Sequence, residues 1–127
     1  HQYLMENELY VKTREGGAYH GWCWPRDTTW VDFMNPHARS YIKSLYNKVP
    51  DKVKNKENYI WTDPNVHIWN DMNEPACFDP YEKSMAKSNI HTIGYDQITV
   101  EHRDVHNVYG YFNTQATYEG LLERTGG

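Results

Sequence analysis

Cysteine is scarce in this 127-residue sequence, which contains only Cys23 and Cys77. Two cysteines make neither a disulfide framework nor a zinc-ligand pattern, and whether the two thiols pair stays open at this point. The sequence also lacks an Asn-x-Ser/Thr glycosylation acceptor. It has no apolar run of about 20 residues, the length that a membrane-spanning helix needs. We therefore expect no insertion into a membrane.

Basic residues are in the minority, since 13 Lys and Arg stand against 17 Asp and Glu, for a net charge of −4. An acidic balance repels phosphates, so we expect no nucleic acid as the main partner. Apolar residues make up only 39% of the chain, whereas aromatic residues reach 15%, with eleven Tyr and five Trp. Aromatic rings suit protein cores and sugar faces alike.

The most informative stretch is 68–75, which reads Ile-Trp-Asn-Asp-Met-Asn-Glu-Pro. A short apolar run leads into Asp71, which predicts a buried strand over 66–70 with this carboxylate at its carboxyl-terminal tip. Catalytic groups of α/β barrels sit at that end of the strands. An isolated Asp at a strand end is more often a turn former or a helix cap. The case for catalysis therefore depends on the flanking residues.

Residues 69–75, Trp-Asn-Asp-Met-Asn-Glu-Pro, resemble the nucleophile signature of glycoside hydrolase family 31, the retaining α-glucosidases. The resemblance implies that Asp71 is the catalytic nucleophile and that Trp69 lines the sugar pocket. Met72 is expected near the site without an assigned role. The family's acid/base is an Asp from a later barrel strand, beyond the end of this sequence.

Retaining hydrolysis needs two carboxyl groups about 5–5.5 Å apart across the scissile bond. Glu74 is the obvious second carboxyl, but three residues along one chain make it hard to reach the opposite side of that bond. We expect Glu74 to orient the loop instead. A nucleophile must be ionised, so polar surroundings are expected for Asp71, with Asn70 and Asn73 as hydrogen-bonding neighbours.

Two further strings are similar to the branch of family 31 that trims N-linked glycans in the endoplasmic reticulum. They are Gly-Trp-Cys-Trp-Pro at 21–25 and Glu-His-Arg-Asp-Val-His-Asn-Val-Tyr-Gly at 101–110. The resemblance implies that Trp24 lines the sugar pocket, while packing inside a hairpin stays an alternative for both tryptophans. The family usually has Gly where this chain has Arg26. Since Arg adopts a positive φ only at a cost, we expect a different backbone path there.

Helix signals are clear at two places. Asn35 is a good N-cap for an amphipathic helix over Pro36–Val49, and a long helix opens near Glu101 and is capped by Gly126. We also expect strands over 9–13 and 18–24, joined by a glycine turn, and a loop with a short helix over 75–94.

His102 and His106 stand at i and i+4 on one helix face, which is metal-ligand spacing. A zinc-hydrolase helix would carry Glu directly after the first His, where this chain has Arg103, and no third ligand is evident. We therefore expect hydrogen-bonded histidines at a helix start, with no metal and no cofactor.

The fold class expected for the chain is α/β, with 1–127 a fragment of a family 31 catalytic (β/α)8 TIM barrel, because that domain is several times longer. The resemblance implies a retaining α-glucosidase of the endoplasmic reticulum lumen. Its substrate would be terminal α-linked glucose, such as the α-1,3-glucose of immature N-glycans, and a non-catalytic β subunit is an expected partner. Two alternatives stay open. One is another family 31 α-glucosidase or α-xylosidase, and the other is a non-catalytic sugar-binding homologue.

Overall fold

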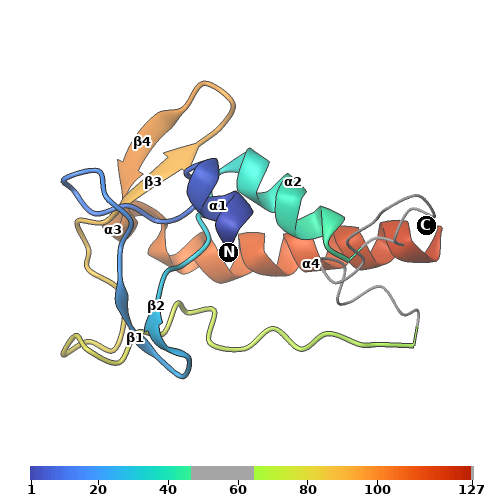
Figure 1. The fold of residues 1–127 in the computed structure, drawn as a ribbon, viewed down its shortest axis with the longest axis horizontal. Helices are drawn as coiled ribbons and strands as arrows, with labels where there is room; N and C mark the ends of the chain where they lie inside the picture. The colour runs from blue at the N-terminus through green and yellow to red at the C-terminus, as the bar shows by residue number, and fades with distance from the viewer. Residues whose placement is uncertain (47–64, 127) are drawn as a thin grey trace.

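The computed structural model describes residues 1–46 and 65–126, and two hairpins and two packed helices dominate them (Figure 1). Both sheets are two-stranded and antiparallel, and these residues contain no parallel strand pair. They form no closed barrel on their own. In chain order the elements are α1 (Gln2–Glu6), β1 (Gly21–Cys23), β2 (Arg26–Thr28), α2 (Pro36–Ser44), β3 (Ile90–Ile93), β4 (Ile98–Glu101), α3 (His102–Val105), the 3-10 turn η2 (His106–Val108) and α4 (Tyr109–Thr125).

An extended stretch at 10–12 lies between the two hairpins and joins them. The Val11 amide donates to the Trp30 carbonyl at 2.8 Å, and Lys12 exchanges two main-chain bonds with Ile90 at 3.0 and 2.8 Å. Residues 9–13 are therefore extended, as predicted, but they form isolated bridges instead of a regular strand. The predicted glycine turn follows, with Gly16 at a φ of +95°.

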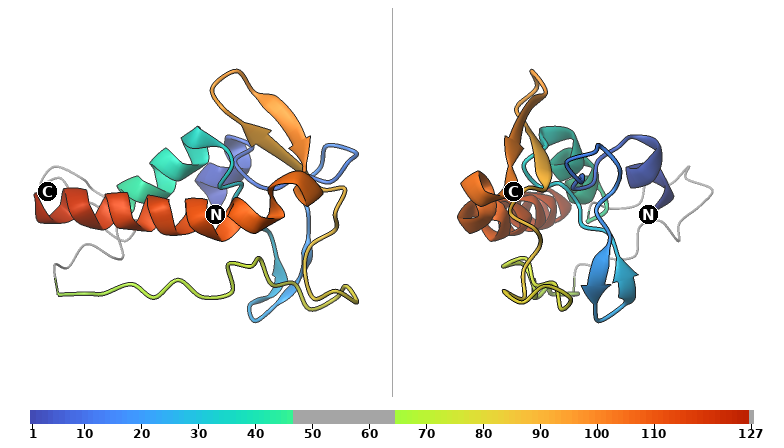
Figure 2. Two further views of the ribbon diagram at one scale, coloured as in Figure 1. Left: turned by 180° about the vertical axis from the view of Figure 1, so that it is seen from behind. Right: turned by 90° about the vertical axis from the view of Figure 1, so that its left-hand side faces the viewer.

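Helices α2 and α4 pack side by side, as Figure 1 and Figure 2 show. Asn35 caps α2 as predicted, since its side chain accepts the His37 amide at 2.9 Å. The described helix ends at Ser44, and Val49 lies outside the described residues. Gly126 ends α4 in the left-handed conformation, so the predicted C-cap is confirmed.

The core lies where the hairpins meet the start of α4. Phe33 and Tyr109 pack edge to face at 5.5 Å between ring centroids, and the buried Tyr109 hydroxyl donates to the Val31 carbonyl at 2.8 Å. Burial, with the nearby charge of Asp32, raises the pKa of Tyr109. The cysteines are buried free thiols and do not pair. The buried cluster comprises Val11, Cys23, Trp30, Phe33, Met34, Cys77, Met85, Tyr109 and Ala116.

Three expectations need correction. Residues 66–70 form an extended segment without strand pairing instead of a buried strand, because a barrel strand is buried only between neighbouring strands. Residues 75–89 contain turns and no helix. The β3–β4 hairpin was not predicted, and its first strand, Ile90–Ile93, lies inside the stretch expected as a loop with a short helix. None of the helices within the described ranges has the length and apolar character to span a bilayer.

Candidate active site

Asp71 ends the extended segment at a sharp turn. The next residue, Met72, has a φ of +61°, a left-handed conformation that costs a non-glycine residue free energy. The Met72 amide donates to Oδ1 of Asp71 at 2.9 Å. The carboxylate is exposed to solvent. Asn70 and Asn73, which were expected to bond it, bond Thr117 and Asn113 of α4 in the described contacts. Strained turns of this kind cluster at functional sites.

Helix α4 holds the segment that leads to Asp71 through side chains on one face. Asn113 accepts the Asn73 amide group at 3.1 Å, and Thr117 bonds the Asn70 side chain at 3.1 Å. About two turns after Thr117, Arg124 donates to the Val66 carbonyl at 2.9 Å. The three helix positions fall within a narrow arc, since they are four and seven residues apart. We call Asn113, Thr117 and Arg124 the polar ladder.

Gly110, the second residue of α4, lies directly beside the loop. A Cβ on Gly110 would lie 2.8 Å from the Asn73 carbonyl oxygen, closer than real Cβ contacts. Any larger residue at position 110 would push the loop away from α4. Gly110 belongs to the motif at 101–110 and brings helix and loop together.

Trp24 and Asp71 line the same cavity, of about 410 Å³, together with Met72. The Trp24 ring is 76% exposed and therefore does not serve as hairpin core. It stands at the tip of the β1–β2 hairpin, and its edge-on contact with Phe78 places the ring centroids 5.3 Å apart. Trp22, on the same hairpin, is about half exposed. An exposed aromatic ring and a carboxylate-bearing residue on one cavity are an arrangement that suits a sugar.

Trp69 lines a second hollow of about 370 Å³, which Asp71 also borders. Its side chain is 87% exposed. Glu74 is exposed and lines neither hollow. The structure thus brings Trp24, Met72 and Trp69 to Asp71 and leaves Glu74 aside.

Arg26 follows the Trp24-Pro25 turn with a φ of +78°. The expectation that arginine would avoid this conformation is wrong. Arg26 is the first residue of β2 and pairs with Cys23 directly across the turn. The side chain is exposed.

A chain of four buried or half-buried groups lies beside the site. His91 donates through Nδ1 to Oδ1 of Asp32 at 2.7 Å. Its Nε2 lies 2.8 Å from Nδ1 of His102, whose Nε2 lies 2.8 Å from Nδ1 of His106. The predicted hydrogen bond between the histidines at the helix start is therefore confirmed. We call Asp32, His91, His102 and His106 the histidine core.

Burial lowers the pKa of His102 from 6.5 to about 3, with smaller contributions from His91 and His106. The His102 ring is therefore neutral at pH 7. One of its two nitrogens donates a hydrogen bond within the histidine core and the other accepts one. Among the residues that the structure describes, no cluster of three or more His, Cys, Asp or Glu side chains is arranged to hold a metal.

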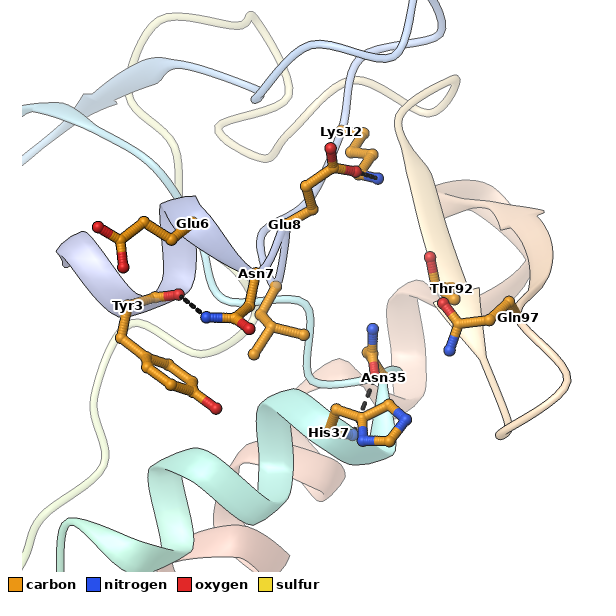
Figure 3. A pocket seen from close by; sticks show the side chains of 10 residues that line it. Tyr3, Glu6, Asn7, Glu8, Lys12, Asn35, His37, Thr92 and Gln97 are labelled. Atoms are coloured by element: carbon orange, nitrogen blue, oxygen red, sulfur yellow. Dashed lines mark hydrogen bonds and ion pairs between the residues drawn. The ribbon is translucent and has the colours of Figure 1, made fainter.

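Another cavity, of about 450 Å³, lies between α1, the start of α2 and the β3–β4 hairpin (Figure 3). Glu8 borders it and pairs with Lys12 at 2.7 Å. The hydrogen bond and charge of Lys12 lower the pKa of Glu8. None of the predicted site residues lines this cavity, so it is separate from the one at Asp71.

The polar ladder and Gly110 were missed by sequence reasoning. Polar residues on an amphipathic helix resemble a solvated face, so Asn113 and Thr117 carried no signal of their own. Thr117 is nevertheless buried, because the extended segment covers it.

Comparison with known proteins gives one consistent result. The whole chain, residues 1–127, matches the family model described as the glycosyl hydrolases family 31 TIM-barrel domain. Neutral alpha-glucosidase AB of Homo sapiens is 42% identical over 127 residues, which are 100% of this chain and 12% of that protein.

Solved structures agree with this. The α3-Glc2-bound glucosidase II alpha subunit is 39% identical with a TM-score of 0.80, over 99% of this chain and 12% of that chain. The endoplasmic reticulum glucosidase II heterodimer of catalytic subunit and regulatory-subunit binding domain is 40% identical with the same TM-score, 0.80, and the same coverage, 99% and 12%. The chain therefore spans about an eighth of its relatives' length, 12%. On this evidence the chain belongs to glycoside hydrolase family 31 and is similar over its whole length to glucosidase II alpha subunits.

Proposed function

We propose that this chain supplies the nucleophile and part of the sugar pocket of a retaining α-glucosidase. Asp71 attacks the anomeric carbon of a terminal α-linked glucose, the leaving oxygen takes a proton from an acid/base, and water then releases the glucosyl group from Asp71. The observation that carries the proposal is the cavity shared by Asp71 and the exposed ring of Trp24.

The second carboxyl comes from a later strand of the complete barrel, of which this chain is one part. Glu74 is unsuited to the role because it is exposed away from both hollows that Asp71 borders. It orients the loop behind the nucleophile, while Trp24 and Trp69 contact the sugar from two sides of Asp71. The catalytic step uses these carboxyl groups and requires no cofactor.

The substrate proposed is α-1,3-linked glucose on an immature N-glycan, in the lumen of the endoplasmic reticulum. Support comes from the relatives: one solved structure is named for a bound α3-linked glucose disaccharide and another for a complex with a regulatory subunit. A non-catalytic β subunit is the partner proposed on the same ground.

Substitution of Asp71 in the complete enzyme tests the proposal. Asp71→Asn keeps the shape of the side chain but removes the nucleophile, so hydrolysis of an activated α-glucoside should fall by many powers of ten, far more than one lost hydrogen bond of about 1 kcal/mol explains. Asp71→Gly should be equally inactive and be partly rescued by azide, which enters the vacated space.

Glu74→Gln serves as the matched control, because it removes a nearby carboxyl without removing the proposed nucleophile. It should retain much more activity than Asp71→Asn. Near-normal turnover by Asp71→Asn would contradict the proposal. A parent enzyme that binds glucosides but never hydrolyses them would favour the non-catalytic homologue.

A further inference from the structure

The outer edge of β1 is paired with the loop that follows the candidate nucleophile. The Trp22 carbonyl accepts the Phe78 amide at 2.7 Å, and the Trp22 amide donates to Oδ2 of Asp79 at 2.6 Å. The amide and the carbonyl of Trp22 are therefore both hydrogen-bonded, on the edge of β1 that faces away from β2. The carboxylate of Asp79 takes the place that a carbonyl of a neighbouring strand would take in a sheet.

Two further contacts show how closely the hairpin and this loop fit. A Cβ on Gly21 would lie 2.6 Å from Sγ of the buried Cys77, so the base of β1 rests against the loop with no room for a side chain. At the tip, the Trp24 and Phe78 rings meet at an interplanar angle of 88°. The loop thus contacts the hairpin at its base, its middle and its tip.

Among the contacts that side chains make here, the hydrogen bond that Asp79 accepts from the Trp22 amide is the strongest. Hydrogen bonds to a charged acceptor are shorter and roughly twice as strong as neutral ones. The Asp79 side chain is exposed, so its removal opens no core cavity. Its charge also reaches the base of the hairpin, where it adds to the burial and the Cys77 contact that raise the pKa of Tyr19.

We propose that Asp79 is a positioning residue for sugar binding. By holding the Trp22 amide, it places the β1–β2 hairpin, and therefore the Trp24 ring, at the separation from Asp71 that a glucose ring needs. The inference rests on the proposed function, since it assumes that Trp24 stacks on the sugar bound beside Asp71. Asp79 itself contacts neither the sugar nor the reacting atoms.

Calorimetric binding of the α-1,3-linked glucose disaccharide tests this in the complete protein carrying Asp71→Asn, where no turnover interferes. Asp79→Ala should weaken binding by up to about tenfold, because sugar binding must then order the hairpin that the Asp79 bond otherwise holds in place. Asp79→Asn keeps an oxygen acceptor for the Trp22 amide and should restore affinity to within about threefold of the parent. Trp24→Ala, which removes the stacking ring, should lose at least as much affinity as Asp79→Ala.

Asp27→Ala is the matched control, because it removes another exposed carboxylate of the same hairpin, one that bonds only His20 at 3.1 Å among the described contacts. It should bind like the parent. Thermal unfolding of Asp79→Ala should stay cooperative, with a midpoint within about 2–4 °C of that of Asp27→Ala, which shows that the variant still folds.

Three outcomes overturn the inference. Asp79→Ala binding with parental affinity would show that the bond does not place Trp24. Equal weakening by Asp27→Ala, or Asp79→Asn no better than Asp79→Ala, would show a general charge effect. No binding of the disaccharide by the parent itself would overturn the proposed function, and the positioning role with it.

Discussion

The histidine core and the segment 66–71 are both held by side-chain hydrogen bonds, yet they differ in completeness. Asp32 accepts the Thr92 and Met34 amides at 2.7 and 3.1 Å in addition to His91, and all of these groups are buried or half buried. The segment 66–71 is bonded on one side, by the polar ladder, and its alternate residues are exposed.

The difference shows which part of the architecture this chain completes by itself. The side chains of the histidine core find their hydrogen-bond partners inside this chain. They connect the β3–β4 hairpin to α3 without help from other parts of the barrel. The segment 66–71 runs roughly parallel to α4 in Figure 1 and in the left view of Figure 2, and it pairs with no strand in the described residues. We expect the missing neighbours to be strands of the complete barrel, which would bury this segment and leave Asp71 at their common edge.

The largest effect is expected from isolating the chain. The 127-residue chain alone should hydrolyse no α-glucoside and show no cooperative unfolding, because it has one of the two carboxyls and an unpaired extended segment. Calorimetry and a glucoside assay check this against the complete protein. Hydrolysis combined with cooperative unfolding of the isolated chain would contradict the comparison.

The second largest effect is expected from acid, which should lower the folding stability that the histidine core contributes. The pKa of His102 is lowered from 6.5 to about 3 in the folded protein. Between these values the unfolded state binds a proton that the folded state does not, so stability is present above pH 6.5 and is lost as the pH falls. The loss approaches about 1.4 kcal/mol per pH unit.

Thermal midpoints of the complete protein between pH 7 and 4 measure this slope. His102→Gln should flatten the slope, because it removes the buried group that takes up a proton on unfolding. Parallel slopes for the parent and His102→Gln would show that His102 is not the group that titrates.

Gly110→Ala should displace the loop that follows Asp71. Alanine normally stabilises a helix relative to glycine by about 1 kcal/mol, but here its Cβ would meet the Asn73 carbonyl at 2.8 Å. We expect a net destabilisation of about 1–3 kcal/mol and a lower kcat. Gly17→Ala, whose Cβ would meet nothing within 4 Å, is the control. A more stable Gly110→Ala protein with normal kcat would contradict the close approach.

The smallest effect is expected from the polar ladder. Thr117→Val keeps the side-chain shape but removes the bond to Asn70, which should cost about 1 kcal/mol and lower kcat more than it changes KM. Thr117→Ser should restore both. Thr125→Val removes a hydroxyl that bonds only carbonyls of its own helix turn in the described contacts and should have little effect on kcat. Equal losses of kcat for Thr117→Val and Thr125→Val would contradict a special role of the Thr117–Asn70 bond.

Local chemistry made part of this structure predictable. Asn35 before Pro36 and Gly126 after the last helical turn mark helix ends through main-chain bonding within a few residues, and both were correct. The histidines at i and i+4 likewise meet, although the long helix predicted from Glu101 is divided into α3, η2 and α4. Contacts over longer separations were not predictable: nothing in the sequence pairs Trp22 with Asp79 or Asn70 with Thr117.

The predicted strand at 66–70 failed for a related reason. Its apolar pattern is that of a barrel strand, and such a pattern yields a buried strand only when neighbours lie on both sides. In the described residues no neighbouring strand is present, so the segment is extended and partly exposed. The roles assigned to the residues around Asp71 stay predictions. The structure shows that Trp24 and Met72 line one cavity with Asp71.

Trapping the covalent intermediate tests most directly whether Asp71 is the nucleophile. A 5-fluoroglucosyl inhibitor forms a slowly hydrolysed glycosyl-enzyme, and fragment-ion sequencing of the labelled peptide can separate Asp71 from Glu74, three residues away. We predict the fluoroglucosyl group on the Asp71 carboxylate, and no label in Asp71→Asn. A label on Glu74, or turnover of the inhibitor by Asp71→Asn at the parental rate, would contradict the assignment.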